Sequence, residues 1–285
     1  MKQKEAEPTA VTAWNEASAP VQVDAGTAVA IAQIGDEIKA AVVTAKHFPR
    51  DENVSFTKIM KSCERASFAE RAAYLYKRGG TDITGPSVHL AREQARCWGN
   101  MRSGIRIVAV TEDEIHIAGW AFDAENNNYS EGQDRFKKLI QRKSSSGTRW
   151  IEADERELRE LINRRGAICE RNALLKILPP DITEIALQRA RETLHKAANG
   201  ELEQNREDAI RRLVLAFDRL AVTSVMLELY LNHPLKVITA DEIARLREVY
   251  RSIEDGNSTR EEHFEVTPAL TGPASPLNTK VQEAH

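Results

Sequence analysis

The chain has 285 residues, which is enough for one large domain or two smaller domains that each bury a core. Its 40 basic and 43 acidic residues give a net charge of −3, which excludes a uniformly basic coat for nucleic acid but permits a locally basic face. We expect a cytoplasmic, soluble protein, because the sequence shows no secretory signal and no apolar run near the roughly 18 residues that cross a bilayer. The three cysteines lie far apart in helical patterns, which predicts reduced core thiols.

Composition divides the chain into four parts. Residues 1–25 are rich in Ala, Thr, Pro and Glu without periodicity, which predicts a flexible N-terminal arm. Residues 256–285 have few apolar side chains and predict a flexible, mildly acidic tail. Between them we expect an α+β core over residues 26–198 and a helical C-terminal module over residues 201–255.

The core is predicted to begin with helices. Apolar residues recur at helical spacing over residues 27–78, and the Gly- and Thr-rich stretch 79–87 then predicts a loop. The helix that follows ends near Trp98 and is expected to turn Arg92 and Arg96 outward.

The hydrophobic period then changes from helix to strand. Alternation over residues 105–109 and 115–122 predicts two antiparallel strands, and residues 129–136 can pair back as a third. Residues 142–147 predict a loop, followed by a long helix over residues 153–178 that ends before two prolines. The predicted buried stripe of that helix consists of Leu158, Leu161, Ile162, Ile168, Cys169 and Leu175.

The remainder is predicted to be helical. From about residue 181 to residue 253 we expect helices separated at residues 199–200, 222–223 and 233–234. The predicted fold class is therefore α+β, with an antiparallel three-stranded β-meander packed with helices, followed by an α-helical C-terminal module.

Signatures of common enzyme classes are absent from the sequence. It contains no phosphate-binding loop, dinucleotide-binding glycine motif, zinc-protease motif or nucleophile elbow. The seven histidines lie too far apart to predict a metal site. A nuclease site near Asp181 and Glu184 is a weak rival, because Ala186 stands where the motif needs lysine. We expect no enzyme activity, no catalytic residues, no metal and no cofactor.

Charge placement is the feature that points to a function. Residues 135–150 contain six basic residues and no acid, and the following helix carries further arginines. Arginine suits phosphate because its planar donors match the phosphate oxygens. An alternative is that Arg156 and Arg159 only pair with nearby glutamates on a solvated helix. The predicted DNA-binding residues are Arg92, Arg96, Arg135, Lys137, Lys138, Arg142, Lys143, Arg149, Arg156, Arg164, Arg165 and Arg171, with Tyr129, Phe136 and Trp150 as candidates for base stacking.

Two stretches carry a resemblance to a known family. The first is Gly85-Pro86-Ser87-Val88-His89-Leu90-Ala91, which runs into Trp98-Gly99-Asn100 and is followed by Gly104. The second is Asn163-Arg164-Arg165-Gly166-Ala167-Ile168-Cys169-Glu170-Arg171-Asn172-Ala173-Leu174. With the order of predicted elements over about residues 55–195, they resemble the core of the single-strand annealing proteins. These comprise the phage recombinases of the RecT, Red-beta and Erf type and the eukaryotic annealing mediator that shares their fold.

The resemblance implies a protein of phage-type homologous recombination that binds and anneals single-stranded DNA without ATP. It implies a ring or filament of identical subunits, and a C-terminal module that contacts a phage exonuclease or a host single-strand-binding protein. The alternative is a non-enzymatic phage adaptor or regulatory protein whose helical C-terminal module binds a protein partner.

Overall fold

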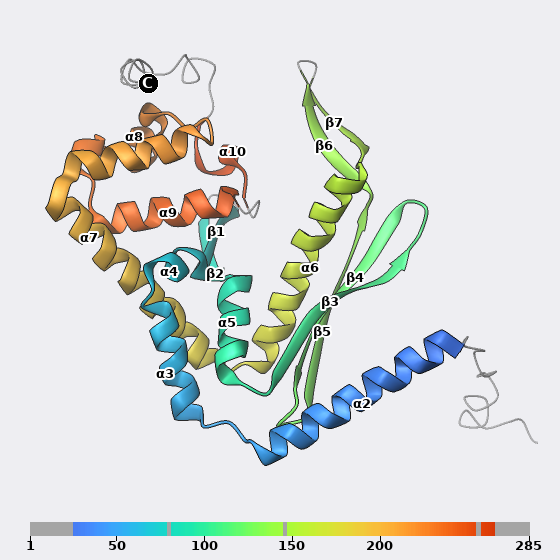
Figure 1. The fold of residues 1–285 in the computed structure, drawn as a ribbon. Helices are drawn as coiled ribbons and strands as arrows, with labels where there is room; N and C mark the ends of the chain where they lie inside the picture. The colour runs from blue at the N-terminus through green and yellow to red at the C-terminus, as the bar shows by residue number, and fades with distance from the viewer. Residues whose placement is uncertain (1–24, 79–80, 145–146, 255–257, 266–285) are drawn as a thin grey trace, which may run out of the picture. The chain divides into compact units, whose positions relative to one another are not determined.

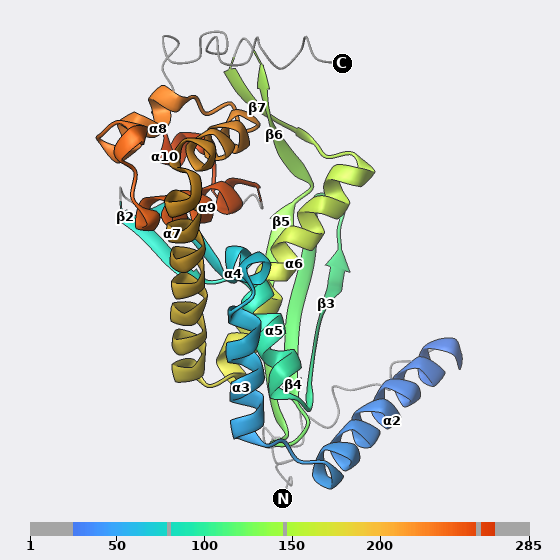
Figure 2. The ribbon, with the colours of Figure 1, turned by 60° about the vertical axis from the view of Figure 1, so that its left-hand side comes forward.

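The computed structural model describes residues 25–78, 81–144, 147–254 and 258–265 (Figures 1 and 2). The chain divides at Phe48 and Pro49 into two compact units, which we describe separately. In the first unit the described part is helix α2 (Ala25–His47) and Phe48. Most of the two predicted arms lies outside the described residues.

The second unit contains residues 49–198 of the predicted core, whose first part lies in the first unit, and the predicted C-terminal module. Its helices are α3 (Glu52–Cys63), α4 (Ala66–Ala72), α5 (Val88–Trp98), α6 (Glu155–Ile177), α7 (Pro180–Asp218), α8 (Ser224–Leu231), α9 (Ala240–Glu254) and α10 (Arg260–His263), with a 3₁₀ turn η1 (Leu235–Val237). Its strands are β1 (Ala73–Arg78), β2 (Thr81–Pro86), β3 (Met101–Val110), β4 (Glu114–Asp123), β5 (Asn128–Lys137), β6 (Leu139–Ser144) and β7 (Gly147–Glu152). The predicted α+β fold class is confirmed.

The central sheet is the predicted antiparallel meander, with strand order β3-β4-β5. Helix α6 covers one face of it, as Figure 2 shows. Ile115, Ile117 and Phe136 on that face are buried together with Cys169 of α6. The apolar alternation that predicted the strands is therefore the contact surface for the helix.

Glycines allow α6 to approach the sheet closely. An added Cβ at Gly119 would lie 2.0 Å from the backbone nitrogen of Glu170, and one at Gly132 would lie 3.1 Å from the backbone oxygen of Cys169. On the helix side, a Cβ at Gly166 would lie 2.6 Å from a side-chain carbon of Ile105. The helix and the sheet thus pack nearly backbone to backbone where these residues meet.

Two segments predicted as loops are instead β-hairpins. Strands β1 and β2 pair around residues 79–80, and β6 pairs with β7 around residues 145–146. Glycines and serines suggested loops here, whereas the described residues on either side of 79–80 and of 145–146 pair through their backbones. The predicted helical stretch 27–78 consequently ends at Ala72, where β1 begins.

Helix α6 begins and ends as its sequence predicts. The Asp154 side chain accepts a hydrogen bond from the Glu157 backbone, and the Glu157 side chain accepts one from the Asp154 backbone, which forms a capping box. The helix ends at Ile177, and its C-cap Leu178 directly precedes the two prolines. The predicted buried stripe is wrong at Ile168, whose side chain remains 39% exposed.

The C-terminal module has its own apolar core. Helix α7 continues through the predicted break at residues 199–200, because Ala198 and Leu202 are buried and hold that turn in place. The backbone departs from helical geometry at Asn205 instead, where φ is −160° and ψ is 94°. Phe264, which the sequence placed in a flexible tail, is buried in this core against Phe217.

Candidate nucleic-acid interface

The basic residues of β5 and α6 do not form the single phosphate track that the sequence predicts. Asp134 and Phe136 of β5 face α6, where they contact Arg165. Because side chains alternate along a strand, Arg135 and Lys137 lie on the opposite face of the sheet. The sheet therefore separates the predicted strand residues from the predicted helix residues.

The basic residues between β5 and α6 occupy other surfaces. Lys138 is half-buried beyond the end of β5. Arg142 of β6 donates to Glu157 at 2.6 Å, and Arg149 of β7 stands opposite it in the hairpin. This hairpin projects beyond the start of α6 in Figure 1. The side chain of Lys143 lies outside the described residues.

The first turns of α6 carry arginines that are already paired. Arg156 donates to Glu160 at 3.1 Å, and Arg159 donates to Glu155 at 2.9 Å. Both pairs are well exposed to solvent. The alternative interpretation of these two arginines, as part of a solvated helix face, agrees with this geometry.

The three aromatic candidates differ in their exposure. Phe136 is buried, and the guanidinium of Arg165 lies 4.9 Å from its ring centroid, so this ring is not free to stack on a base. Tyr129 is exposed on the far face of the sheet, and Trp150 is exposed on β7. Neither of these two is next to the arginines that the structure brings together.

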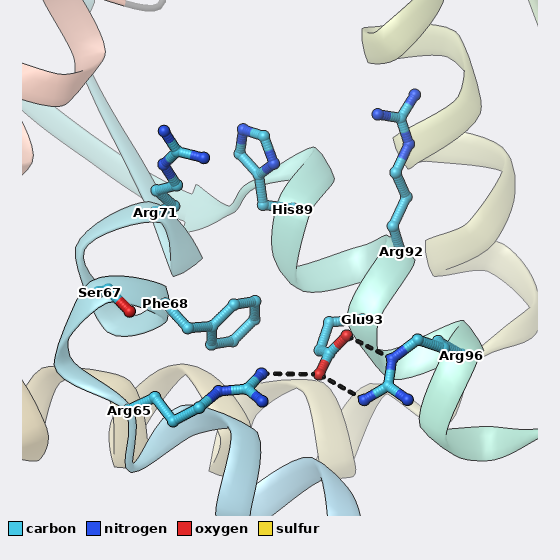
Figure 3. Close-up of a pocket in the computed structure, with 8 residues that line it drawn as sticks. All are labelled: Arg65, Ser67, Phe68, Arg71, His89, Arg92, Glu93 and Arg96. Carbon is cyan, nitrogen blue, oxygen red and sulfur yellow. Dashed lines mark hydrogen bonds and ion pairs between the residues drawn. The ribbon is translucent and has the colours of Figure 1, made fainter.

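Those arginines line a groove formed by α4, α5 and α6. It consists of a first hollow of about 440 Å³ and a second of about 240 Å³, and both are lined by His89 and Arg92. Figure 3 shows the first hollow. We call this surface the arginine groove; its basic residues are Arg65, Arg71, His89, Arg92, Arg96, Arg164 and Arg171.

Helix α5 supplies one wall because of its amphipathic pattern. Leu90, Ala91 and Gln94 are buried, so positions 89, 92, 93 and 96 share the face toward the groove. The Ser87 side chain caps the helix by accepting from the backbone of Leu90, and it also donates to the backbone oxygen of Arg71. This serine joins the start of α5 to the end of α4.

In the described part of the chain, one acidic residue lines the first hollow. Glu93 accepts hydrogen bonds from Arg96 at 2.7 and 2.8 Å and from Arg65 at 2.9 Å, so it lies between these two arginines in Figure 3. The hydrogen bond from Arg96 is the main cause that lowers the pKa of Glu93 to about 2. Glu93 is therefore charged at neutral pH and neutralises only part of the surrounding positive charge.

A buried carboxylate fixes Arg92 at the junction of the two hollows. Glu170 of α6 accepts from Arg92 Nε at 3.1 Å, from Arg92 Nη2, and from the Ser103 hydroxyl at 2.7 Å. Its side chain is 5% exposed, whereas that of Arg92 is 45% exposed. The acid thus orients the arginine, and part of the guanidinium still faces solvent.

Two arginines of the groove have no such partner. Arg71 and Arg164 are exposed, and neither side chain forms a hydrogen bond or ion pair with another residue in the described part of the chain. Arg171 in the second hollow lies 4.6 Å from the ring centroid of Tyr74. Unpaired guanidinium groups in a recess are suited to donate hydrogen bonds to phosphate oxygens.

Four of the twelve basic residues predicted from the sequence lie in the arginine groove: Arg92, Arg96, Arg164 and Arg171. Sequence reasoning missed Arg65, Arg71 and His89. The helical spacing of His89 with Arg92 and Arg96 was a usable signal. The sequence around Arg65 and Arg71 contains no such signal, because the packing of α4 against α5 brings these two residues into the groove.

The cysteines are buried free thiols, as predicted. Burial raises the pKa of the Cys63 thiol to about 12. Among the described residues no cluster of three or more His, Cys, Asp or Glu side chains is arranged to hold a metal ion. None of the described helices combines the length and apolar character needed to span a membrane.

Comparison of the chain with models of known families, with curated proteins and with solved structures finds no match in any of the three.

Proposed function

We propose that this protein binds single-stranded DNA in the arginine groove and anneals complementary strands without ATP, as a ring or filament of identical subunits. The observation that carries the proposal is the composition of the groove. Among the described residues, six arginines and one histidine line its two hollows, and Glu93 is the one acid. Neutralisation of phosphates by such a surface releases counterions and favours binding without reading sequence.

Apolar side chains between the arginines favour a single strand over a duplex. Phe68 lines the first hollow, and Tyr74 and Ile168 line the second. Paired bases in a duplex are shielded from such groups, whereas the bases of a single strand can contact them. The groove therefore suits a polymer with accessible bases.

The two stretches that resemble annealing proteins supply two walls of this groove. The first contains the start of α5, and the second lies within α6. Ser87, Val88 and His89 of the first face Arg164 and Arg171 of the second across the smaller hollow. The two stretches that resemble annealing proteins therefore line the same hollow, which supports the proposal that the bound strand is annealed.

Salt dependence tests the phosphate contacts. For the double variant Arg71→Ala/Arg164→Ala we expect weaker binding of single-stranded DNA. The slope of log affinity against log salt concentration is negative, and we expect its magnitude to decrease by about 1.4, which is about 0.7 for each of the two lost phosphate contacts. Fluorescence anisotropy titrations of a labelled oligonucleotide at several salt concentrations measure both quantities.

The matched control is Arg156→Ala/Arg159→Ala, on the exposed and self-paired start of α6. It should leave the slope unchanged. Equal slopes for the groove variant and the unmodified protein would show that the groove does not hold phosphate.

A second candidate is the adaptor function, in which the C-terminal module binds a protein. Val225 and Leu229 lie one turn apart on α8 and are 49% and 55% exposed, and Val237 of η1 is 61% exposed. Exposed apolar groups of this kind are typical of protein contacts. Light scattering that shows no growth of particle size with oligonucleotide would favour the adaptor.

A further inference from the structure

The smaller hollow of the arginine groove differs from the larger one in its chemistry. Val88, Ala167 and Ile168 give it an aliphatic wall, and Tyr74 adds an aromatic ring. The larger hollow is lined mainly by arginines, together with Phe68 and His89. The two parts of the groove therefore suit different parts of a nucleotide chain.

We infer that the smaller hollow takes one unstacked nucleobase of the bound strand, while the larger hollow holds the adjoining phosphates. The inference rests on the proposed binding of single-stranded DNA and adds to it a contact with the base.

Ile168 is an exposed apolar side chain among the arginines of the smaller hollow. It lies on α6 between Arg164, one turn earlier, and Arg171, one turn later, and its side chain is 39% exposed. A purely phosphate-binding wall gains nothing from an exposed isoleucine among arginines. A flat apolar surface such as a base would cover it and gain hydrophobic burial.

Tyr74 and Arg171 lie next to each other in the smaller hollow. The guanidinium of Arg171 lies 4.6 Å from the centroid of the Tyr74 ring. A Cβ at Gly85 would lie 2.7 Å from the Tyr74 hydroxyl oxygen and 2.9 to 3.0 Å from two atoms of the ring, so glycine at this position leaves room for the tyrosine. Because this guanidinium already covers one face of the Tyr74 ring, the inserted base stacks on the other face of the Arg171 plane, a group on which unpaired bases stack in proteins.

Size limits what the smaller hollow can hold. Its volume of about 240 Å³ is below the ~300–1,000 Å³ of pockets that enclose drug-sized ligands. One flat ring system fits this space better than a complete nucleotide with its sugar and phosphate. The rest of the nucleotide must then extend out of the hollow.

The connection between the hollows accounts for the rest of the nucleotide. His89 and Arg92 line both of them, so the chain that leaves the base passes directly into the arginine-lined part. Arg164 lines the smaller hollow and Arg71 lines the larger one, and the side chain of each has no hydrogen-bond or ion-pair partner among the described residues. They are available for the phosphates on either side of the inserted base.

The experiment compares thymidine oligonucleotides of about 15 nucleotides with abasic backbones of the same length and charge. We expect the unmodified protein to bind the thymidine strand more tightly than the abasic strand. Ile168→Ala should lower affinity for the thymidine strand about fivefold and leave affinity for the abasic strand unchanged. Anisotropy titrations at one fixed salt concentration measure these affinities.

Ile185→Ala is the matched control, because Ile185 is 45% exposed on α7 and does not line the groove. It should retain the preference for thymidine, and thermal melts should show that both variants are folded. Equal, salt-dependent affinity for thymidine and abasic strands would overturn the base pocket and leave the phosphate groove standing. Absence of binding to either strand would overturn both proposals.

Discussion

Replacing Gly119 with alanine is expected to destabilise the protein by more than about 3 kcal/mol, or to prevent folding. The added methyl group would lie 2.0 Å from the backbone nitrogen of Glu170 and 2.3 Å from the backbone carbon of Cys169. These are backbone atoms of α6, so no flexible side chain can move aside. The helix must shift from the sheet, which also displaces Glu170 and the Arg92 guanidinium that it holds. Thermal or urea unfolding followed by circular dichroism measures the effect.

Gly200→Ala is the control for this substitution. Gly200 lies within α7, and a Cβ there meets nothing within 4 Å. Alanine is favoured over glycine in a helix interior, so this variant should gain about 0.5–1 kcal/mol of stability. A Gly119→Ala protein with unchanged stability would contradict the close packing of α6 against β4.

Charge reversal in the arginine groove is expected to lower affinity for single-stranded DNA by at least about a hundredfold. In the double variant Arg71→Glu/Arg164→Glu, two guanidinium groups that attract phosphate are replaced by carboxylates that repel it. Annealing should be lost in parallel, because strands that are not held cannot be brought together. Energy transfer between two labelled complementary strands, measured without ATP, reports the annealing rate.

The control reverses charge on the other basic surface, with Arg135→Glu/Lys137→Glu on the face of the sheet away from α6. We expect this variant to anneal within about threefold of the unmodified protein, because screened, distant charges contribute little. If the sheet-face variant loses annealing and the groove variant keeps it, the strand binds to the sheet and not in the groove.

The sequence predicted the central architecture because its signals were local. Alternation of apolar residues around Ile115 and Ile117 specified a half-buried strand, and Pro179 with Pro180 marked the end of α6. The two hairpins were missed because the glycines and serines in these segments of the sequence outweighed the residues beside them. Only backbone pairing with a partner strand distinguishes such a segment from a loop.

The candidate site was predicted only in part, for two physical reasons. The acid-free run 135–150 is continuous in sequence, but strand alternation and the β6–β7 hairpin distribute its side chains over different surfaces. The arginine groove combines α4, α5 and α6, which are separated in sequence by the hairpin β1–β2 and by the meander. Arg65 and Arg71 join Arg164 only through that tertiary packing, which no local pattern encodes.

Ultraviolet cross-linking of the full chain to an oligothymidine strand, with the modified peptides identified by mass spectrometry, tests the central claim most directly. Aromatic side chains mark each basic surface separately: Phe68 and Tyr74 in the groove, Tyr129 on the sheet face, and Trp150 on the β6–β7 hairpin. We expect adducts on the peptides that contain Phe68 and Tyr74. Adducts confined to the peptides of Tyr129 or Trp150 would contradict the arginine groove as the place where the strand binds.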